Sequence, residues 1–330
     1  MFATTDLKRI EREYEYKRNE ANEVFLKEKD SLYKKNPRLL ELDQEIRKIG
    51  LEAAKLSLSQ TDNKENLQKS LRENLKKCTE EKENILKKLH FTMVPNYSCD
   101  KCHDTGYIQN GAFSEMCSCM KQKLINEAYQ TSNLYTLKNE NFEHFNFDYY
   151  DAKTSPELYA SELSPRENMQ KIVDISKEFI HHFDSEEQKN LLFTGTTGTG
   201  KTYLSSCIAN EMIQKGYTVL YQTAPILLDS IFESKYDKNS TDKTLYHQFL
   251  EVNLLIIDDL GTENLTAAKF QELFNLLNTR LLKPDTKTVI STNLSLEELR
   301  KHYDLRILSR LIGHYTICRF YGKDIRLLKA

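Results

Sequence analysis

The feature that most constrains this chain is a glycine-rich stretch between a short apolar run and an amphipathic run. The stretch consists of Gly195, Thr196, Thr197, Gly198, Thr199, Gly200, Lys201 and Thr202. Residues 191–193 before it are apolar, as in a buried strand, and residues 203–214 after it place apolar side chains on one helical face. A G-x-x-x-x-G-K-T sequence that leaves a strand and opens a helix predicts a loop whose backbone N–H groups surround a phosphate.

A second apolar run adds a metal site to this loop. Residues 254–257 read Leu-Leu-Ile-Ile and end in Asp258 and Asp259, so a buried strand delivers acids toward the phosphates. Lys201 is expected to contact the β- and γ-phosphates, while Thr202 and Asp258 are expected to hold Mg²⁺. The predicted cofactors of this half are therefore ATP and Mg²⁺.

The order of these two motifs resembles that of AAA+ ATPases, which implies roles for further residues. In AAA+ proteins the acid after the metal ligand polarises the attacking water, and Asp259 occupies that place, with Glu263 as the alternative. Asn293 follows the apolar residues 288–290 and occupies the sensor-1 place, where it would orient the water near the γ-phosphate. A cap for a helix over residues 295–301 is the other interpretation of Asn293.

Arginines near the end of the sequence extend this likeness. Residues 306–311 resemble the segment that projects an arginine finger into a neighbouring subunit, where a guanidinium stabilises charge on the transferred phosphoryl group. Arg310 is the favoured finger, with Arg306 and a plain surface arginine as alternatives. Arg326 ends a Gly-Lys-Asp-Ile-Arg sequence and resembles the sensor-2 arginine.

Five motifs in this order, between Phe142 and Arg326, resemble the bacterial helicase loaders of the DnaC/DnaI type. The transposase helpers of the IstB type share the same ATPase core. The resemblance implies an α/β fold, an AAA+ P-loop NTPase core with a parallel sheet. Because only four residues follow Arg326, we expect the core to lack the full helical lid of most AAA+ proteins.

The first ninety residues are dense in lysine and glutamate and predict helices. Between Leu39 and Leu56, apolar residues recur at alternating steps of three and four, as in a coiled-coil seam. A third helix repeats this rhythm, although Lys82 interrupts it, and residues 57–63 suit a turn. We expect an antiparallel helical hairpin or a dimerising coil, with a solvated single helix as the alternative.

Four of the seven cysteines form a C-x₂-C-x₁₄-C-x-C pattern: Cys99, Cys102, Cys117 and Cys119. Two close thiolate pairs across a hairpin supply the four soft ligands of a tetrahedral Zn²⁺ site, and His103 is a reserve ligand. Reduced structural cysteines are the alternative, but they would leave a small segment with little core. Loaders of the DnaI type resemble the chain here too, which implies that the module grips the helicase.

These patterns divide the chain into four predicted parts. They are a helical coiled-coil region (1–92), a cysteine-rich zinc module (93–130), a linker that begins the nucleotide pocket (131–164) and an AAA+ ATPase domain (165–330). The net charge of −2 gives no overall attraction to nucleic acid or anionic lipid. No apolar run approaches the roughly 18 residues of a membrane span, so we predict a cytoplasmic protein without a membrane partner.

The predicted function is that of a helicase loader. ATP-bound subunits would form a homo-oligomer, engage single-stranded DNA and deliver a hexameric replicative helicase. Residues 224–248 combine basic and aromatic side chains, a pattern that suits single-stranded DNA, although a solvated helix pair explains it equally well. They include Lys235, Tyr236, Lys238, Lys243 and Tyr246. Two other functions stay open: an IstB-like helper of a DNA transposase, and a zinc-stabilised adaptor with a nucleotide-gated switch.

Overall fold

The computed structural model describes residues 4–58, 64–111, 113–128, 140–236 and 245–328. The chain divides into two compact units, one of residues 11–115 and the other of residues 1–10 together with 116–330. Each unit is described by itself. None of the described helices combines the length and the apolar character that a membrane crossing requires.

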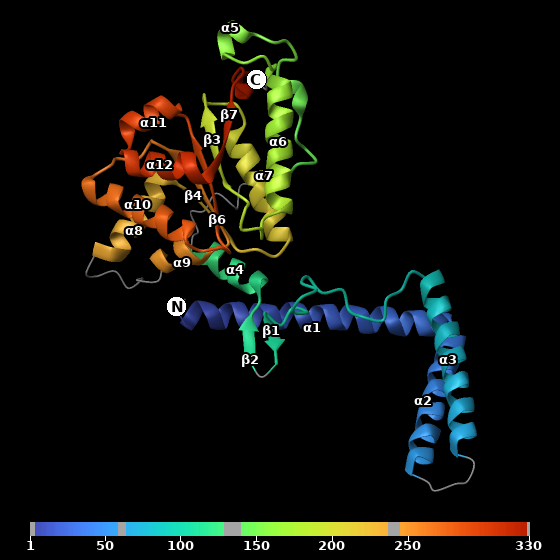
Figure 1. Cartoon of the computed structure of the whole chain (residues 1–330). Coiled ribbons are helices and arrows are strands. Elements are labelled where there is room, and N and C mark those ends of the chain that lie inside the picture. Colours follow the sequence, from blue (N-terminus) through green and yellow to red (C-terminus); the bar gives the residue numbers. More distant parts are fainter. Residues whose placement is uncertain (1–3, 59–63, 112, 129–139, 237–244, 329–330) are drawn as a thin grey trace. The chain divides into compact units, whose positions relative to one another are not determined.

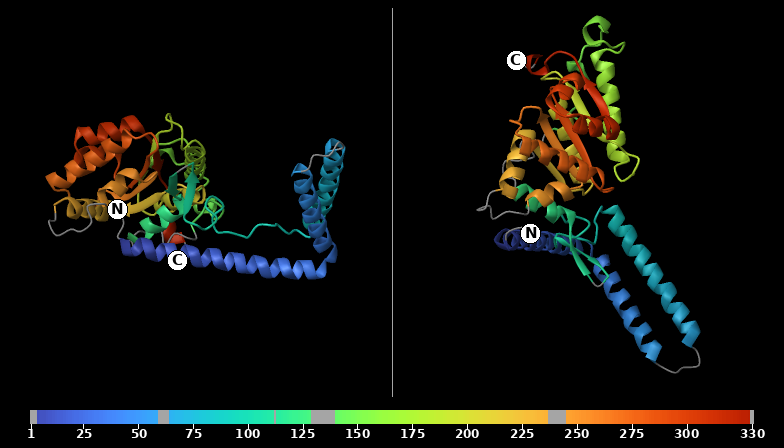
Figure 2. Two further views of the ribbon diagram at one scale, coloured as in Figure 1. Left: turned by 90° about the horizontal axis from the view of Figure 1, so that it is seen from below. Right: turned by 60° about the vertical axis from the view of Figure 1, so that its left-hand side comes forward.

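The amino-terminal region is helical, with helices α1 (Thr4–Lys35), α2 (Pro37–Leu58) and α3 (Lys64–Lys88). Pro37 begins α2, where its fixed φ suits the first helical turn and its missing N–H loses no hydrogen bond. α2 and α3 lie side by side and antiparallel (Figure 1 and Figure 2), with Leu39 and Leu42 buried. The structure thus pairs both helices within one chain as a hairpin. Most of the predicted turn, residues 59–63, lies outside the described residues.

Polar pairs join the two helices where the apolar seam is interrupted. Lys82 forms an ion pair with Asp43, whose second oxygen accepts a hydrogen bond of 2.7 Å from the Tyr33 hydroxyl. Arg38 donates two bonds to Glu81, at 2.8 and 3.0 Å, in a two-pronged contact. Lys82 therefore breaks the hydrophobic rhythm without leaving a charge unpaired.

The carboxy-terminal half is built on a five-stranded parallel sheet in the order β4-β5-β6-β3-β7. Its strands are β3 (Asn190–Gly195), β4 (Val219–Thr223), β5 (Leu254–Leu260), β6 (Lys287–Thr292) and β7 (Tyr315–Phe320). Because helices alternate with the strands, all the strands run in one direction and end at the same edge of the sheet. This is the predicted α/β architecture with a parallel sheet.

Helices cover both faces of this sheet (Figure 1). One face packs against α6 (Pro165–His181) and α7 (Lys201–Gln214), and the apolar core there includes Phe193, Ile208 and Tyr221. The other face packs against α8 (Ala224–Tyr236), α9 (Leu245–Glu251), α10 (Ala267–Leu281), α11 (Leu296–His302) and α12 (Leu305–His314). Since both faces are buried, the strands are almost continuously apolar, as the sequence indicated.

Shorter elements complete the described structure. They are β1 (Tyr107–Asn110), β2 (Phe113–Met116), α4 (Ser118–Ala128), α5 (Pro156–Tyr159) and the 3₁₀ turns η2 (Phe147–Tyr149) and η3 (Ile325–Leu328). The buried Gln122 of α4 pairs with the edge strand β4, donating to the Val219 carbonyl at 2.8 Å and accepting from the Val219 N–H at 2.6 Å. The side-chain amide takes the place of a neighbouring strand here, and it satisfies the backbone N–H and C=O groups of one residue of the edge strand.

Candidate nucleotide and metal sites

The glycine-rich loop connects β3 to α7, as predicted. Gly195, Gly198 and Gly200 have φ angles of +135°, +72° and +97°, a region that side-chain-bearing residues avoid. A Cβ at Gly195 would lie 1.9 Å from the Phe320 carbonyl oxygen, and one at Gly200 would lie 2.5 Å from the Tyr150 hydroxyl. Only glycine therefore permits this close backbone turn at the start of α7.

Lys201 opens α7 and lies almost completely buried beneath the loop. Its Nζ donates to the carbonyl oxygens of Gly195 and Thr196, both at 2.7 Å. Burial lowers the pKa of Lys201 to about 8, although the carboxylates of Asp259 and Asp258 oppose this shift. The glycine cradle, the N-terminus of α7 and this ammonium group together suit a phosphate chain.

Asp258 ends the buried part of β5 beside Thr202. The Thr202 hydroxyl donates to Asp258 Oδ2 at 3.1 Å, so a hydroxyl and a carboxylate lie next to each other at the loop. Both are hard oxygen donors of the kind that Mg²⁺ prefers. The predicted pair is thus brought together, and its chemistry fits a magnesium ion between protein and phosphates.

Asp259 lies at an irregularity of β5. Its φ is +55°, and the pairing of β5 with β6 shifts register between Ile257 and Leu260. A bulge of this kind re-aims a side chain, and left-handed backbone at a non-glycine residue is strained. Asn293 Nδ2 donates to Asp259 Oδ1 at 3.3 Å. Burial, followed by the charge of Asp258, raises the pKa of Asp259.

The two other sequence interpretations at this edge involve Glu263 and a cap. Buried Glu263 accepts hydrogen bonds from the Tyr303 hydroxyl and from the Gly261 N–H, the latter at 2.8 Å, and it is not among the pocket-lining residues. Ser295 caps α11 through its own side chain. Asn293 therefore does not cap α11, and its side chain is available to hydrogen-bond Asp259.

The loop, Asp259 and Asn293 line a cavity of about 650 Å³. Aromatic residues from the segment before α6 also line it, including Phe145, Tyr149 and Tyr150. Phe145 also contacts Tyr203 edge to face, at 5.7 Å between ring centroids. Such rings suit the flat base of a nucleotide. The predicted linker (131–164) was expected to begin the nucleotide pocket, but its aromatic density assigned no role to any single ring.

Arg326 lies in the same cavity, where it pairs with Asp324. Its Nε and Nη2 donate to the two carboxylate oxygens at 3.0 and 2.9 Å. The backbone N–H of Ile325 donates to the Gly198 carbonyl at 2.9 Å. The segment after β7 is thereby attached to the phosphate-binding loop, which places Arg326 near Lys201 and Asp259.

Arg306 and Arg310 lie elsewhere, on α12 against α10. Arg310 Nε donates to Asn278 Oδ1 at 3.0 Å, and its guanidinium carbon lies 5.9 Å from the Phe274 ring centroid. Arg306 is exposed, lies 5.1 Å from the same ring and pairs with Asp304. Neither arginine lines the cavity, so within this chain they do not reach the nucleotide site.

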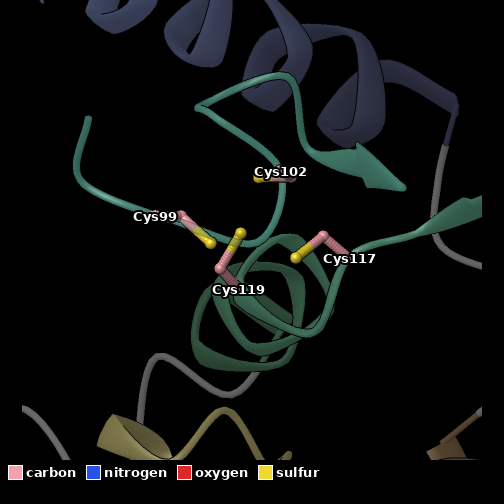
Figure 3. Close-up of side chains that lie close together, drawn as sticks. All are labelled: Cys99, Cys102, Cys117 and Cys119. Atoms are coloured by element: carbon pink, nitrogen blue, oxygen red, sulfur yellow. The ribbon is translucent and has the colours of Figure 1, made fainter. Parts of the chain in front are cut away.

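The four predicted cysteine ligands gather in one place (Figure 3). Cys99 and Cys102 come from a tight loop, whereas Cys117 and Cys119 lie at the start of α4, and all four sulfur atoms lie within 4.8 Å of one another. Tetrahedral Zn²⁺ with Zn–S bonds of about 2.3 Å places its sulfurs about 3.8 Å apart. The cluster fits such an ion, as the sequence predicted.

Asp104 shapes the first half of this cluster. Its buried carboxylate accepts hydrogen bonds from the Ser98 and Cys99 N–H groups at 2.8 and 3.0 Å. His103, the reserve ligand, is not part of the cluster, and its ring lies 5.3 Å from that of Tyr97. The role of Asp104 was not predictable, because an acid close to a cysteine carries no local signal of it.

The basic and aromatic residues considered for DNA contact are partly engaged with each other. Lys235 forms an ion pair with the buried Glu272, and its Nζ lies 3.8 Å from the Tyr246 ring centroid. Lys238 and Lys243 lie outside the described residues. The part that the structure describes therefore agrees with the helix-pair interpretation of this region.

Together, the parallel sheet, the glycine loop and the acid-bearing strand define a P-loop nucleotide-binding domain. Comparison with known families matches residues 166–329 to the family described as IstB-like ATP binding protein. Residues 166–329 therefore form an IstB-like ATP-binding domain.

Curated relatives include replicative helicase loaders. The replicative helicase loader DnaC of Escherichia coli strain K12 is 26% identical over 137 residues, 41% of this chain and 55% of the relative. DnaC of Buchnera aphidicola subsp. Baizongia pistaciae is 29% identical over 148 residues, 44% of this chain and 58% of the relative. The chain thus spans little more than half the length of these relatives, and it is homologous to them over that part.

An insertion-sequence protein is also similar. The IS232 protein of Bacillus thuringiensis subsp. berliner, described as ATP-binding, is 29% identical over 172 residues, 50% of this chain and 65% of the relative. Among solved structures, the DnaC helicase loader matches with a TM-score of 0.45 at 21% identity, covering 56% of this chain and 99% of that one. The sheet and loop described above carry the fold assignment.

Proposed function

We propose that the protein is an ATP-dependent loader that delivers the replicative DNA helicase onto single-stranded DNA in the cytoplasm. The observation that carries this proposal is the homology to replicative helicase loaders. The nucleotide site supports it, because such a loader needs ATP as the source of free energy and the cavity joins a phosphate cradle to an aromatic base site.

ATP hydrolysis follows from the groups at this cavity. Lys201 and the loop N–H groups hold the β- and γ-phosphates, and Mg²⁺ bound through Thr202 and Asp258 would neutralise charge on them. Asp259 accepts the proton of the attacking water, and Asn293 holds the Asp259 carboxylate in place. The position of Glu263 against Tyr303 favours Asp259 as the base.

The site is completed by a second copy of the chain. Arg310 lies on α12, away from the cavity of its own chain, so it acts in trans on the nucleotide of a neighbouring subunit. Arg326 contacts the phosphates in cis from the segment attached to Gly198. ATP thereby favours a homo-oligomer, and an isolated monomer binds ATP but hydrolyses it slowly.

The amino-terminal half recruits the helicase in this proposal. The α2–α3 hairpin and the cysteine module precede the ATPase domain, and none of their described residues lines the nucleotide cavity. A structural Zn²⁺ holds the module in a fixed shape, as a recognition surface requires. Single-stranded DNA is engaged by the ATPase oligomer.

A helper of a DNA transposase is the second candidate function. The family match and the IS232 relative favour it. The two functions differ in the partner. The experiment is therefore co-purification of the full-length protein with purified hexameric replicative helicase and, separately, with the transposase of an IS21-type element, each with and without ATP.

We expect a stable complex with the helicase, and transfer of that helicase onto single-stranded DNA that depends on ATP. Lys201→Ala is the matched variant: it should still capture the helicase but fail in ATP-dependent transfer. Binding to the transposase alone would refute the loader. Helicase capture without any ATP turnover by the wild-type oligomer would instead favour the zinc-stabilised adaptor with a nucleotide-gated switch.

A further inference from the structure

The carboxylate of Asp258 is held by donors on both oxygens. Oδ2 accepts from the Tyr221 hydroxyl at 2.7 Å and from the Thr202 hydroxyl at 3.1 Å. Oδ1 accepts from the Ser291 hydroxyl and from the Asp259 N–H, the latter at 3.1 Å. Because the donors come from different elements on opposite sides, they fix the rotation of the carboxylate plane.

Tyr221 is the donor that the edge strand β4 contributes. It pairs with Ile256 of β5, two residues before Asp258, and it is completely buried in the core beneath α7. A phenylalanine would fill this apolar position equally well, so packing does not require the hydroxyl group. The Tyr221 hydroxyl is the donor in its bond to Asp258, because an ionised carboxylate can only accept.

We propose that Tyr221 is a positioning residue for the magnesium site, because its hydroxyl holds Asp258 in the orientation in which Thr202 and Asp258 face one cation together. This inference rests on the proposed ATPase function. Ser291, from β6 on the opposite side, restrains the other oxygen. Metal ligands are commonly oriented by such outer contacts, whose loss typically lowers metal affinity or activity about 10- to 100-fold.

The test is Tyr221→Phe in the full-length protein, which keeps the ring and removes only the hydroxyl. Binding of a fluorescent ATP analogue is titrated at increasing Mg²⁺ concentrations and again in excess EDTA. We expect the affinity for the analogue in EDTA to stay within about twofold of wild type. The Mg²⁺ concentration that gives half of the maximal increase in analogue affinity should rise about tenfold. Tyr315→Phe is the matched control, because Tyr315 is also buried but lies at the start of β7, and its titration should match wild type.

Ser291→Ala provides a second variant, which removes the donor on the opposite oxygen and should also raise the Mg²⁺ requirement. It keeps the proposal testable if Tyr221→Phe does not fold. The positioning role would be overturned if a folded Tyr221→Phe protein had the same Mg²⁺ requirement as wild type. Where Ser291→Ala is used instead, the same result in that variant would overturn it. Failure of wild-type protein itself to bind the analogue in a Mg²⁺-dependent way would instead refute the proposed ATPase function.

Discussion

Asn293 donates a hydrogen bond to Asp259 across 3.3 Å, from the segment that follows β6 to the bulge of β5. The strained backbone of Asp259, with φ at +55°, turns the side chain toward this amide and into the nucleotide cavity. A carboxylate with a raised pKa that is fixed by an amide suits a general base.

Asp259→Asn should therefore lower kcat for ATP hydrolysis by about a hundredfold or more, because the water loses its proton acceptor. ATP affinity should be nearly unchanged, since the phosphate cradle and the Asp258–Thr202 pair remain. Steady-state ATPase assays combined with equilibrium binding separate the two effects.

Glu263→Gln is the matched control for this prediction. Glu263 is buried against Tyr303 and Gly261, so Glu263→Gln should lower the free energy of unfolding by about 1–3 kcal/mol. The kcat for ATP hydrolysis should stay within about threefold of wild type. A large loss of kcat in Glu263→Gln, together with normal turnover in Asp259→Asn, would assign the base to Glu263.

Arg310 should act only across subunits. Arg310→Ala and Asp258→Asn should each hydrolyse ATP poorly alone, but a mixture should recover part of the turnover. Recovery is expected because a mixed oligomer contains sites with an intact Asp258 facing an intact Arg310. Absence of recovery would exclude Arg310, and the same mixing assay with Arg306→Ala then tests the alternative finger.

The cysteine cluster should bind about one Zn²⁺ per chain, measured by elemental analysis of purified protein. Cys117→Ser should lose the metal and destabilise the module, because metal binding supplies much of the folding free energy of so small a segment. Cys207→Ser, a buried cysteine in α7, should retain full zinc content. Metal-free wild-type protein would show that the four cysteines are reduced structural residues.

The parts of the fold that local pattern determines were predictable. Residues 191–193, 254–257 and 288–290 lie in β3, β5 and β6, and the glycine loop opens α7 as expected. Each of these segments can be recognised in the sequence by an uninterrupted apolar run or by glycines at fixed spacing. The cysteine cluster was predictable for the same reason, because its two pairs carry the spacing of a metal site.

Features that depend on contacts between distant segments were not predictable. The bulge at Asp259 arises from the pairing of β5 with β6. Strand β4 was not predicted either, although residues 219–221 form an apolar run after Gly216. The role of Tyr221 was missed with it, because a tyrosine in a buried strand looks like core until its hydroxyl is seen to reach Asp258.

Isothermal titration of the full-length protein with ATP and Mg²⁺ tests the phosphate-binding loop most directly. We predict one ATP per chain for wild type and a loss of affinity of about 100-fold or more in Lys201→Ala, because the cradle loses the ammonium group expected to contact the phosphates. Lys171→Ala, an exposed lysine of α6, should bind as wild type does. Equal ATP affinity in wild type and Lys201→Ala would contradict the assignment of residues 195–202 as the nucleotide site.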